Sequence, residues 1–242
     1  MFPITHIWFA EKVMGFRDNS LILGAIFPDI VISGCLDYKQ THYCGFGLYN
    51  DLVESNQTFA KAMITHTVDP KGLDYYGDEN YKSGNKGYCF QKGQLIVDQV
   101  IDACNIPEGF GLWKAHNFIE MGIELNIIDN QQILLSDLHR AFQDYAAIEQ
   151  AAWLIEDYYT LRRNEIVESY KKFSQYIELD KSDCHTMAAK YNLQMQSKHS
   201  ISIDVEKTAE IIDRCRSLIK SDFQEFIQYC SINVKNMLDK SH

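Results

Sequence analysis

The sequence predicts an all-α protein, and three of its features lead to this class. Apolar residues recur at helical spacing in most segments, and between residues 48 and 68 they fall on one side of a helix. Only 4 prolines and 13 glycines interrupt the 242 residues, fewer than the many turns of an all-β fold need. Apolar residues make up 46% of the chain, which is enough for a globular core. We therefore expect long helices with short connections.

The expected helices cover most of the chain. They span residues 4–16, 48–68, 94–104, 110–127, 131–145, 147–160, 162–178, 183–195, 204–220 and 222–238. The apolar segment 21–34 fits one buried helix or two short ones, broken near Pro28. Residues 69–93 are rich in Gly, Tyr, Asn and Asp and carry no helical pattern. We expect them to form a long loop, of the kind that often carries function.

The best candidate for a boundary inside the chain is the segment 126–130. Its composition is not that of a flexible linker. We therefore expect a helical core in residues 1–128 and a helical C-terminal half in residues 129–242, packed together as one domain. The candidate metal ligands described below all lie in the core, which is thus the expected metal-binding part.

Charge and cysteine usage narrow the class of protein. The net charge of -10 reflects a shortage of Lys and Arg, so nonspecific nucleic-acid binding is not expected. The 7 cysteines are odd in number, scattered and without a C-x-x-C pair, which is typical of free thiols in a reducing compartment. The first residues do not have the pattern of a signal peptide, and no apolar run is long enough for a transmembrane segment. A cytoplasmic location is expected.

The strongest local signal for chemistry is the segment KAHNFIEMGIEL. His116 and Glu120 are four residues apart on one expected helix, so they point to the same side, and Glu124 continues the row. The pair lies at the edge of the apolar stripe, where a buried carboxylate needs a partner such as a metal ion. A hydrogen-bonded His–Glu pair at the surface is the alternative.

Other histidines and aspartates of the first half fall in apolar or capping contexts. In AMITHTVDP, an apolar helix ends at His66 and Asp69 follows; in GAIFPDI, Asp29 interrupts an apolar run. His6 and His42 each follow a threonine. Imidazole and carboxylate together suit zinc. The alternatives are that both aspartates cap or turn the chain and that both remaining histidines are core residues.

Taken in order, these motifs resemble those of the zinc-dependent phospholipase C family. This family includes bacterial phospholipases C and the N-terminal domain of the phospholipase D that cleaves glycosylphosphatidylinositol anchors, and it is related to single-strand-specific fungal nucleases. The resemblance covers roughly residues 1–125 and rests on Thr5-His6, Gly24-Ala25-Ile26-Phe27-Pro28-Asp29, Thr41-His42, His66 with Asp69, and His116 with Glu120.

The chain departs from the family pattern in three respects. Many members have an aspartate four residues after the histidine that corresponds to His66, whereas Asp69 lies three residues after it and Pro70 takes the fourth place. A second histidine often follows in the family, and Asp74 stands near that place. The free N-terminal residue of processed members can be a ligand, whereas here residues 1–3 precede the first histidine by several positions. The site is therefore expected to hold two ions where relatives hold three.

The resemblance implies a bundle similar to that of the phospholipases C and nucleases, with a helical C-terminal extension. It implies a zinc cofactor of two or three ions, with iron or manganese as alternatives. The implied ligands are His6, Asp29, His42, His66, Asp69, His116 and Glu120. One ion would be held by His42, His66 and Asp69, and another by His116 and Glu120. The other two ligands would complete or bridge these shells.

The implied activity is hydrolysis of a phosphoester, with a phosphodiester as the expected substrate, by a phospholipase C-like zinc phosphodiesterase. The substrate would be a small-molecule or lipid phosphoester, and Asp29 would be the catalytic residue that orients or deprotonates the attacking water. The alternative is a noncatalytic helical binding or scaffold protein whose metal site is structural or vestigial. A His-Asp pair, an H-E-x-x-H motif and an E-x-x-H motif are all absent, which argues against three other classes of helical metal protein.

The expected loop after His66 has two interpretations. Its tyrosines could line a substrate cleft while its lysines contact phosphate, or the segment could be an ordinary solvated loop. The residues concerned are Tyr75, Tyr76, Tyr81, Tyr88, Lys82, Lys86 and Lys92.

Overall fold

The computed structural model describes residues 1–176 and 182–240, and every regular element in these ranges is helical. The first half contains α1 (Pro3–Met14), α2 (Asn19–Ile26), the 3-10 helix η1 (Phe27–Ser33), α3 (Tyr38–His42), α4 (Gly47–Asp51), the 3-10 turn η2 (Glu54–Asn56), α5 (Gln57–His66), the π-helical turn η3 (Tyr75–Glu79), α6 (Tyr88–Gly93), α7 (Val97–Cys104) and α8 (Glu108–Asn130). The second half contains α9 (Ile133–Gln143), α10 (Tyr145–Tyr159), α11 (Arg163–Tyr176), α12 (Cys184–His199), α13 (Val205–Leu218) and α14 (Phe223–Asp239). The all-α class is confirmed. The end of the expected helix 162–178 lies outside the described residues.

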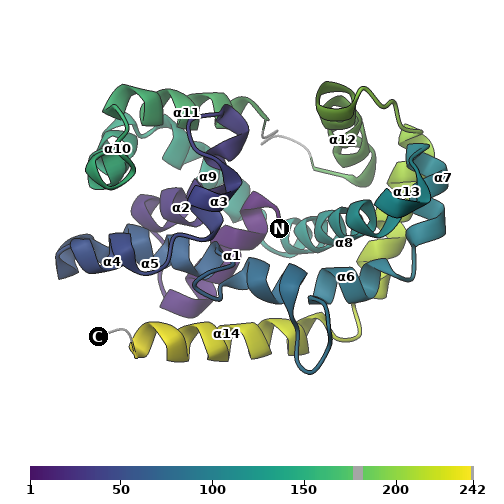
Figure 1. The fold of residues 1–242 in the computed structure, drawn as a ribbon, viewed down its shortest axis with the longest axis horizontal. Helices are drawn as coiled ribbons and strands as arrows, with labels where there is room; N and C mark the ends of the chain where they lie inside the picture. Colours follow the sequence, from purple (N-terminus) through teal and green to yellow (C-terminus); the bar gives the residue numbers. More distant parts are fainter. Residues whose placement is uncertain (177–181, 241–242) are drawn as a thin grey trace.

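The helix α1 lies at the centre of the bundle, where it packs against α2, α5, α8 and α14 (Figure 1). The 23 residues of α8 pack also against α6, α7 and α13, so its buried residues run around the helix instead of along one stripe. One hydrophobic core extends from Ile4 to Leu238 and draws on both halves of the chain.

Two further expectations can be compared with the structure. All 7 cysteines are free thiols, as their spacing predicts. Among the described residues, no helix combines the length and apolar character that crossing a membrane requires.

Helix α1 begins and ends where its sequence directs. Pro3 occupies the first helical position, where its fixed φ favours the helix and its missing N–H costs nothing. The helix ends at Gly15, whose left-handed φ of 80° suits a residue without a side chain. The preceding residue, Phe2, provides no side-chain cap, so the first turn must find its hydrogen-bond acceptors elsewhere.

The small residues of the GAIFPDI segment let α2 approach α5 closely. A side chain at Gly24 would clash with the backbone carbonyl of Phe59 in α5, so glycine is required there. The close contact brings the end of α5 beside α2 and the 3-10 turns of η1, where Asp29 lies. The expected single helix 48–68 is wrong, because extended backbone at Leu52 and Val53 separates α4 from α5.

The segment 69–93 is more regular than expected, since it contains η3 and α6. Its aromatic rings pack on α14. Tyr88 stacks on Phe226 with ring centroids 4.2 Å apart, and Tyr81 meets both Phe226 and Tyr229 edge-on at 5.1 and 5.4 Å. Lys82 and Lys92 pair with Glu225 and Asp222 of the same region. These residues therefore anchor the segment to α14 and do not form an open cleft.

Candidate metal centre

Side chains that are far apart in the sequence come together around the start of α1. They form three groups of His and carboxylate residues, and the ligand atoms within each group lie within 4.8 Å of one another. We call these the Asp74 group (His6, His66 and Asp74), the Asp29 group (Asp29, His42 and His66) and the Glu120 group (Asp78, His116 and Glu120). His66 belongs to two of them, so the first two groups form one continuous centre.

Different elements supply the members of each group. The positions are His6 in α1, Asp29 in η1, His42 at the end of α3, His66 at the end of α5, Asp74 just before η3, Asp78 within η3, and His116 and Glu120 in α8. Helix ends and short turns supply most of them. The centre therefore depends on how the helices are packed and not on any one sequence motif.

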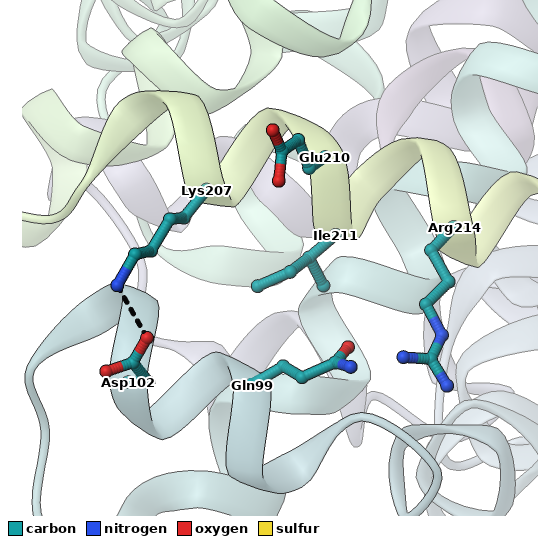
Figure 2. A pocket seen from close by; sticks show the side chains of 6 residues that line it. All are labelled: Gln99, Asp102, Lys207, Glu210, Ile211 and Arg214. Carbon is teal, nitrogen blue, oxygen red and sulfur yellow. Dashed lines mark hydrogen bonds and ion pairs between the residues drawn. The ribbon is translucent and has the colours of Figure 1, made fainter.

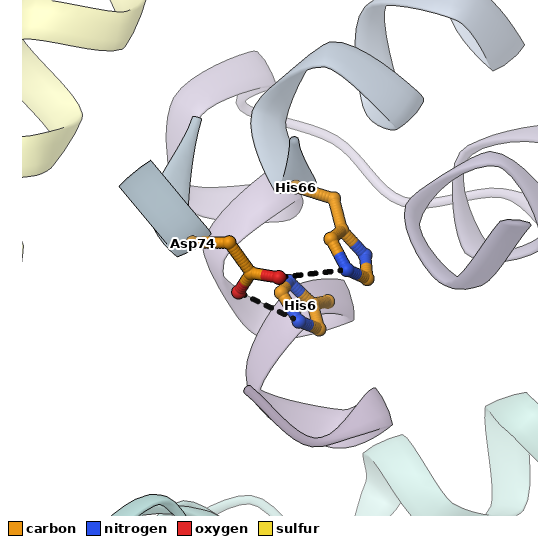
Figure 3. A group of neighbouring side chains, drawn as sticks. All are labelled: His6, His66 and Asp74. Atoms are coloured by element: carbon orange, nitrogen blue, oxygen red, sulfur yellow. Dashed lines mark ion pairs between the residues drawn. The ribbon is translucent and has the colours of Figure 1, made fainter. Parts of the chain in front are cut away.

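The Asp74 carboxylate faces three imidazoles. His6 Nε2 lies 3.4 Å from Oδ1, while His66 Nε2 and His42 Nε2 lie 3.3 and 3.5 Å from Oδ2. Figure 3 shows His6 and His66 turned toward this carboxylate from separate helices. The rings of His6 and His66 are stacked, with centroids 3.3 Å apart and 3° between their planes. Three imidazole nitrogens and one carboxylate thus converge on a single region.

Two of these histidines are held by backbone carbonyls through the ring nitrogen that points away from the centre. His66 Nδ1 lies 2.6 Å from the carbonyl oxygen of Ala25, and His42 Nδ1 lies 3.2 Å from that of Tyr38. A carbonyl only accepts, so Nδ1 donates its proton in both rings, and Nε2 is the nitrogen that faces the centre and could bind a metal ion. This is how proteins orient histidines that bind metal ions.

Several buried polar atoms of the centre have no hydrogen-bond partner in the structure. They are His6 Nδ1 and Nε2, His66 Nε2, His116 Nδ1, Asp78 Oδ1 and Glu120 Oε1. Leaving such atoms unpaired is costly in a folded protein, and their number in one place requires an explanation. A divalent ion in each group would bind one atom of each residue and so give several of these atoms a partner, which means that the residues present fit a metal site.

Burial favours the neutral form of His6, His42 and His116. It lowers the pKa of His42 and of His116 from 6.5 to about 3, and together with the neighbouring His66 it lowers that of His6 well below its usual range. Metal ligation requires an unprotonated imidazole nitrogen. The ring nitrogens are therefore available as ligands at neutral pH.

Asp29 is more accessible to solvent than Asp74. Its side chain is 21% exposed, against 5% for Asp74, and its Oδ1 lies 3.8 Å from His66 Nε2. Burial raises the pKa of Asp29 from 3.8 to about 6. A carboxylate at the opening, with a pKa nearer neutrality, is suited to exchanging protons with water.

The Glu120 group brings two carboxylates together beside a histidine. Burial raises the pKa of Asp78 well above its usual range, and the nearby Glu120 raises it further; burial also raises the pKa of Glu120. Two buried carboxylates this close need a shared proton or a cation between them. His116 is oriented by the ring of Phe90, which stacks on it at 4.3 Å.

The amino group of Met1 lies between the Asp74 and Glu120 groups. Its nitrogen is 2.8 Å from Asp74 Oδ1 and 3.5 Å from Glu120 Oε1. Burial alone would lower the pKa of this amine, but the attraction of Asp74 and Glu120 raises it well above its usual value. The ammonium therefore provides positive charge where the carboxylates need it.

The structure places one expected ligand elsewhere. Asp69 is exposed and belongs to none of the three groups found among the described residues. Its backbone N–H donates to the carbonyl of His42 at 2.9 Å, so it shapes the turn beside the centre. Asp74 occupies the central position instead. Asp78, which sequence reasoning missed, lies four residues further on the same turn, and this acidic pair at helical spacing was the available signal.

A surface hollow of about 340 Å³ lies apart from these ligands, between α7 and α13. Gln99, Asp102, Lys207, Glu210, Ile211 and Arg214 line it. As Figure 2 shows, Lys207 spans the hollow to Asp102, with Nζ 2.7 Å from Oδ2. Its lining is of mixed charge and includes none of the candidate ligands.

Comparisons with protein-family profiles, with curated proteins and with solved structures found no significant match for this chain. The fold and the centre therefore define the class on their own. The chain is an all-α protein with buried His and carboxylate groups that could hold metal ions.

Proposed function

We propose that this protein is a zinc-dependent phosphoester hydrolase that acts on phosphodiesters of small molecules or lipids. The observation that carries the proposal is the convergence of three adjacent His and carboxylate groups that contain unpaired buried donor atoms. Mixed nitrogen and oxygen ligands suit zinc, with iron and manganese as alternatives. The resemblance of the motif order to the zinc-dependent phospholipase C family supports the same class.

When bound in adjacent groups, zinc ions lower the pKa of a coordinated water and neutralise charge on a phosphoryl group. The residues of this chain would complete the site. Asp29, at the opening, would orient the attacking water and accept its proton. His42 and His66 would stay fixed through the carbonyls of Tyr38 and Ala25, which keeps their Nε2 atoms directed inward.

One observation favours a noncatalytic alternative. The side chains of His6 and His66 are completely buried, and the Met1 ammonium already balances part of the carboxylate charge. A centre closed in this way would suit a structural metal or an ion-pair network. The 21% exposure of Asp29 is the feature that favours an open, catalytic site.

The test is zinc content together with hydrolysis of bis(p-nitrophenyl) phosphate, measured on protein purified without a metal-binding tag. We expect two or three zinc ions per chain and zinc-dependent hydrolysis. His66→Ala should lower the zinc content and abolish hydrolysis, because His66 belongs to two of the three groups. The control is His185→Ala, which removes an exposed histidine paired with Glu206. Zinc content near zero after reconstitution would refute the proposal, and zinc without hydrolysis would favour the structural alternative.

A further inference from the structure

Glu124 makes a contact that no metal group explains. It lies in α8, one turn after Glu120, and is only 4% exposed. Its Oε1 accepts the backbone N–H of Ile4 at 2.9 Å. Its Oε2 accepts the backbone N–H of Thr5 at 2.7 Å and the Thr5 hydroxyl at 2.6 Å. A buried carboxylate with three such hydrogen bonds is a specific attachment point.

The attachment replaces a missing helix cap. Phe2 gives α1 no side-chain cap, and Pro3 has no N–H, so Ile4 and Thr5 carry the first unpaired N–H groups of the helix. Glu124 supplies their acceptors from α8, and its negative charge also suits the positive end of α1. The residue that caps α1 thus lies 120 residues after Ile4 in the sequence.

The capped turn lies between two parts of the metal centre. Met1 precedes it and contacts Asp74 and Glu120, whereas His6 follows it directly and faces Asp74. Glu120 and Glu124 are on the same side of α8. The Glu124 contact therefore fixes the distance between α1, which supplies His6, and α8, which supplies the Glu120 group.

We propose that Glu124 is a positioning residue for the metal centre, which docks the first turn of α1 on α8 and thereby aligns the Asp74 group with the Glu120 group. This inference rests on the proposed metal site but not on hydrolysis. Glu124 does not contact the ions or the substrate. It acts through Ile4 and Thr5.

The test compares Glu124→Gln with Asp137→Asn. Glutamine keeps the size of the side chain, but its NH2 group replaces one of the two oxygens, so one of the two backbone N–H groups loses its acceptor and the negative charge is removed. Asp137 is likewise 4% exposed and paired with Arg17 beyond the other end of α1, so its loss destabilises the protein without affecting the first turn. Two quantities are measured in each variant. The first is the rate of hydrogen exchange at the Ile4 and Thr5 amides, and the second is zinc affinity, determined by chelator competition.

In Glu124→Gln we expect both amides to exchange about tenfold faster or more, and zinc affinity to fall by a similar factor. In Asp137→Asn neither should change beyond the effect of global stability. If Glu124→Gln does not fold, Thr5→Val removes the single 2.6 Å hydrogen bond and should shift both readouts in the same direction.

Unchanged exchange in Glu124→Gln would overturn the docking role. Faster exchange with unchanged zinc affinity would overturn the positioning of the metal centre. If the wild-type protein binds no zinc while exchange still accelerates, the proposed function and the positioning role both fail, and only the cap contact remains. Zinc binding without hydrolysis would refute the proposed activity and leave the positioning role intact, so the two proposals can be distinguished.

Discussion

His6 and His66 lie face to face, with ring centroids 3.3 Å apart and their planes within 3° of parallel. Both rings are buried, and the nitrogens that point into the centre have no hydrogen-bond partner among the described residues. Two imidazolium ions could not occupy these positions, because their charges would repel without screening by water. At most one of the two rings can therefore be charged, and a neutral imidazole with a free lone pair is suited to binding a metal ion.

Asp74, whose carboxylate faces both of these rings, was not among the ligands expected from the sequence. Asp74→Asn should lower zinc affinity by more than about 100-fold, beyond the loss typical of residues outside the ligand shell. Asp69→Asn should change it little, because Asp69 is exposed and outside the groups. Chelator competition measures both variants. A larger loss in the Asp69 variant would restore the ligand set expected from the sequence alone.

Asp29 should matter more for turnover than for metal retention in the other groups. We expect Asp29→Asn to keep the zinc of the Glu120 group and to lower kcat by about 100-fold or more, because it removes the group that accepts the proton. Steady-state hydrolysis and zinc content are measured on the same samples, with the exposed Asp98→Asn as control. Wild-type kcat in the Asp29 variant would exclude its role with the attacking water.

The pH dependence of stability should reveal the neutral histidines. The pKa of His116 is about 3 in the folded protein and 6.5 in the unfolded chain, so between these values only the unfolded chain binds the proton. The contribution of His116 to the free energy of unfolding is fully present above pH 6.5. Below that pH it falls by about 1.4 kcal/mol per pH unit. Asp29 and Glu124, with pKa values raised to about 6 and 7, act in the opposite direction over part of this range.

The comparison with a variant isolates the histidine from these opposing groups. Below pH 6.5, the difference in unfolding free energy between metal-free wild-type protein and His116→Gln should shrink by about 1.4 kcal/mol per pH unit. Urea denaturation at several pH values measures it, and His185→Gln, an exposed site, gives the reference. Parallel curves for wild type and His116→Gln would mean that His116 titrates normally.

The packing of segment 69–93 on α14 predicts a large effect from one apolar residue. Phe226 is completely buried against Tyr81 and Tyr88, so Phe226→Ala should lower the free energy of unfolding by about 3–5 kcal/mol. Ile232→Ala, on the same helix but 53% exposed, should cost far less. Equal urea midpoints for the two variants would show that these tyrosines are not anchored as described.

Local patterns in the sequence were sufficient for most of the long helices and for most of the candidate ligands, but not for the break between α4 and α5 or for the helical turns of segment 69–93. His116 and Glu120 are neighbours because four residues make about one helical turn, which is a property of the sequence alone. His6, Asp29, His42 and His66 could be found as polar residues in apolar surroundings, and the structure brings all four into the groups.

The positions of Asp74 and of the Met1 amino group depend on contacts between distant parts of the chain, which no local sequence pattern contains. Asp69 is nearer to His66 in sequence than Asp74, yet the turn after α5 directs Asp69 outward and carries Asp74 back to the centre. That path depends on contacts with α14 more than 130 residues away, such as the hydrogen bond from the Tyr88 hydroxyl to Asp222 at 2.8 Å. The contact between the Met1 amino group and Glu120 likewise joins two residues that are far apart in the sequence and is brought about by the packing of α1 on α8.

The anchoring of residues 81–88 by α14 also bears on when the centre can form during synthesis. The segment with Asp74 and Asp78 leaves the ribosome well before its packing partner at residues 223–239, which follows much later in the sequence. Until then, these two carboxylates lack the support that places them beside the histidines. A nascent chain would therefore bring the candidate ligands together only after α14 has been synthesised, and a chain stalled before α14 would lack the complete centre.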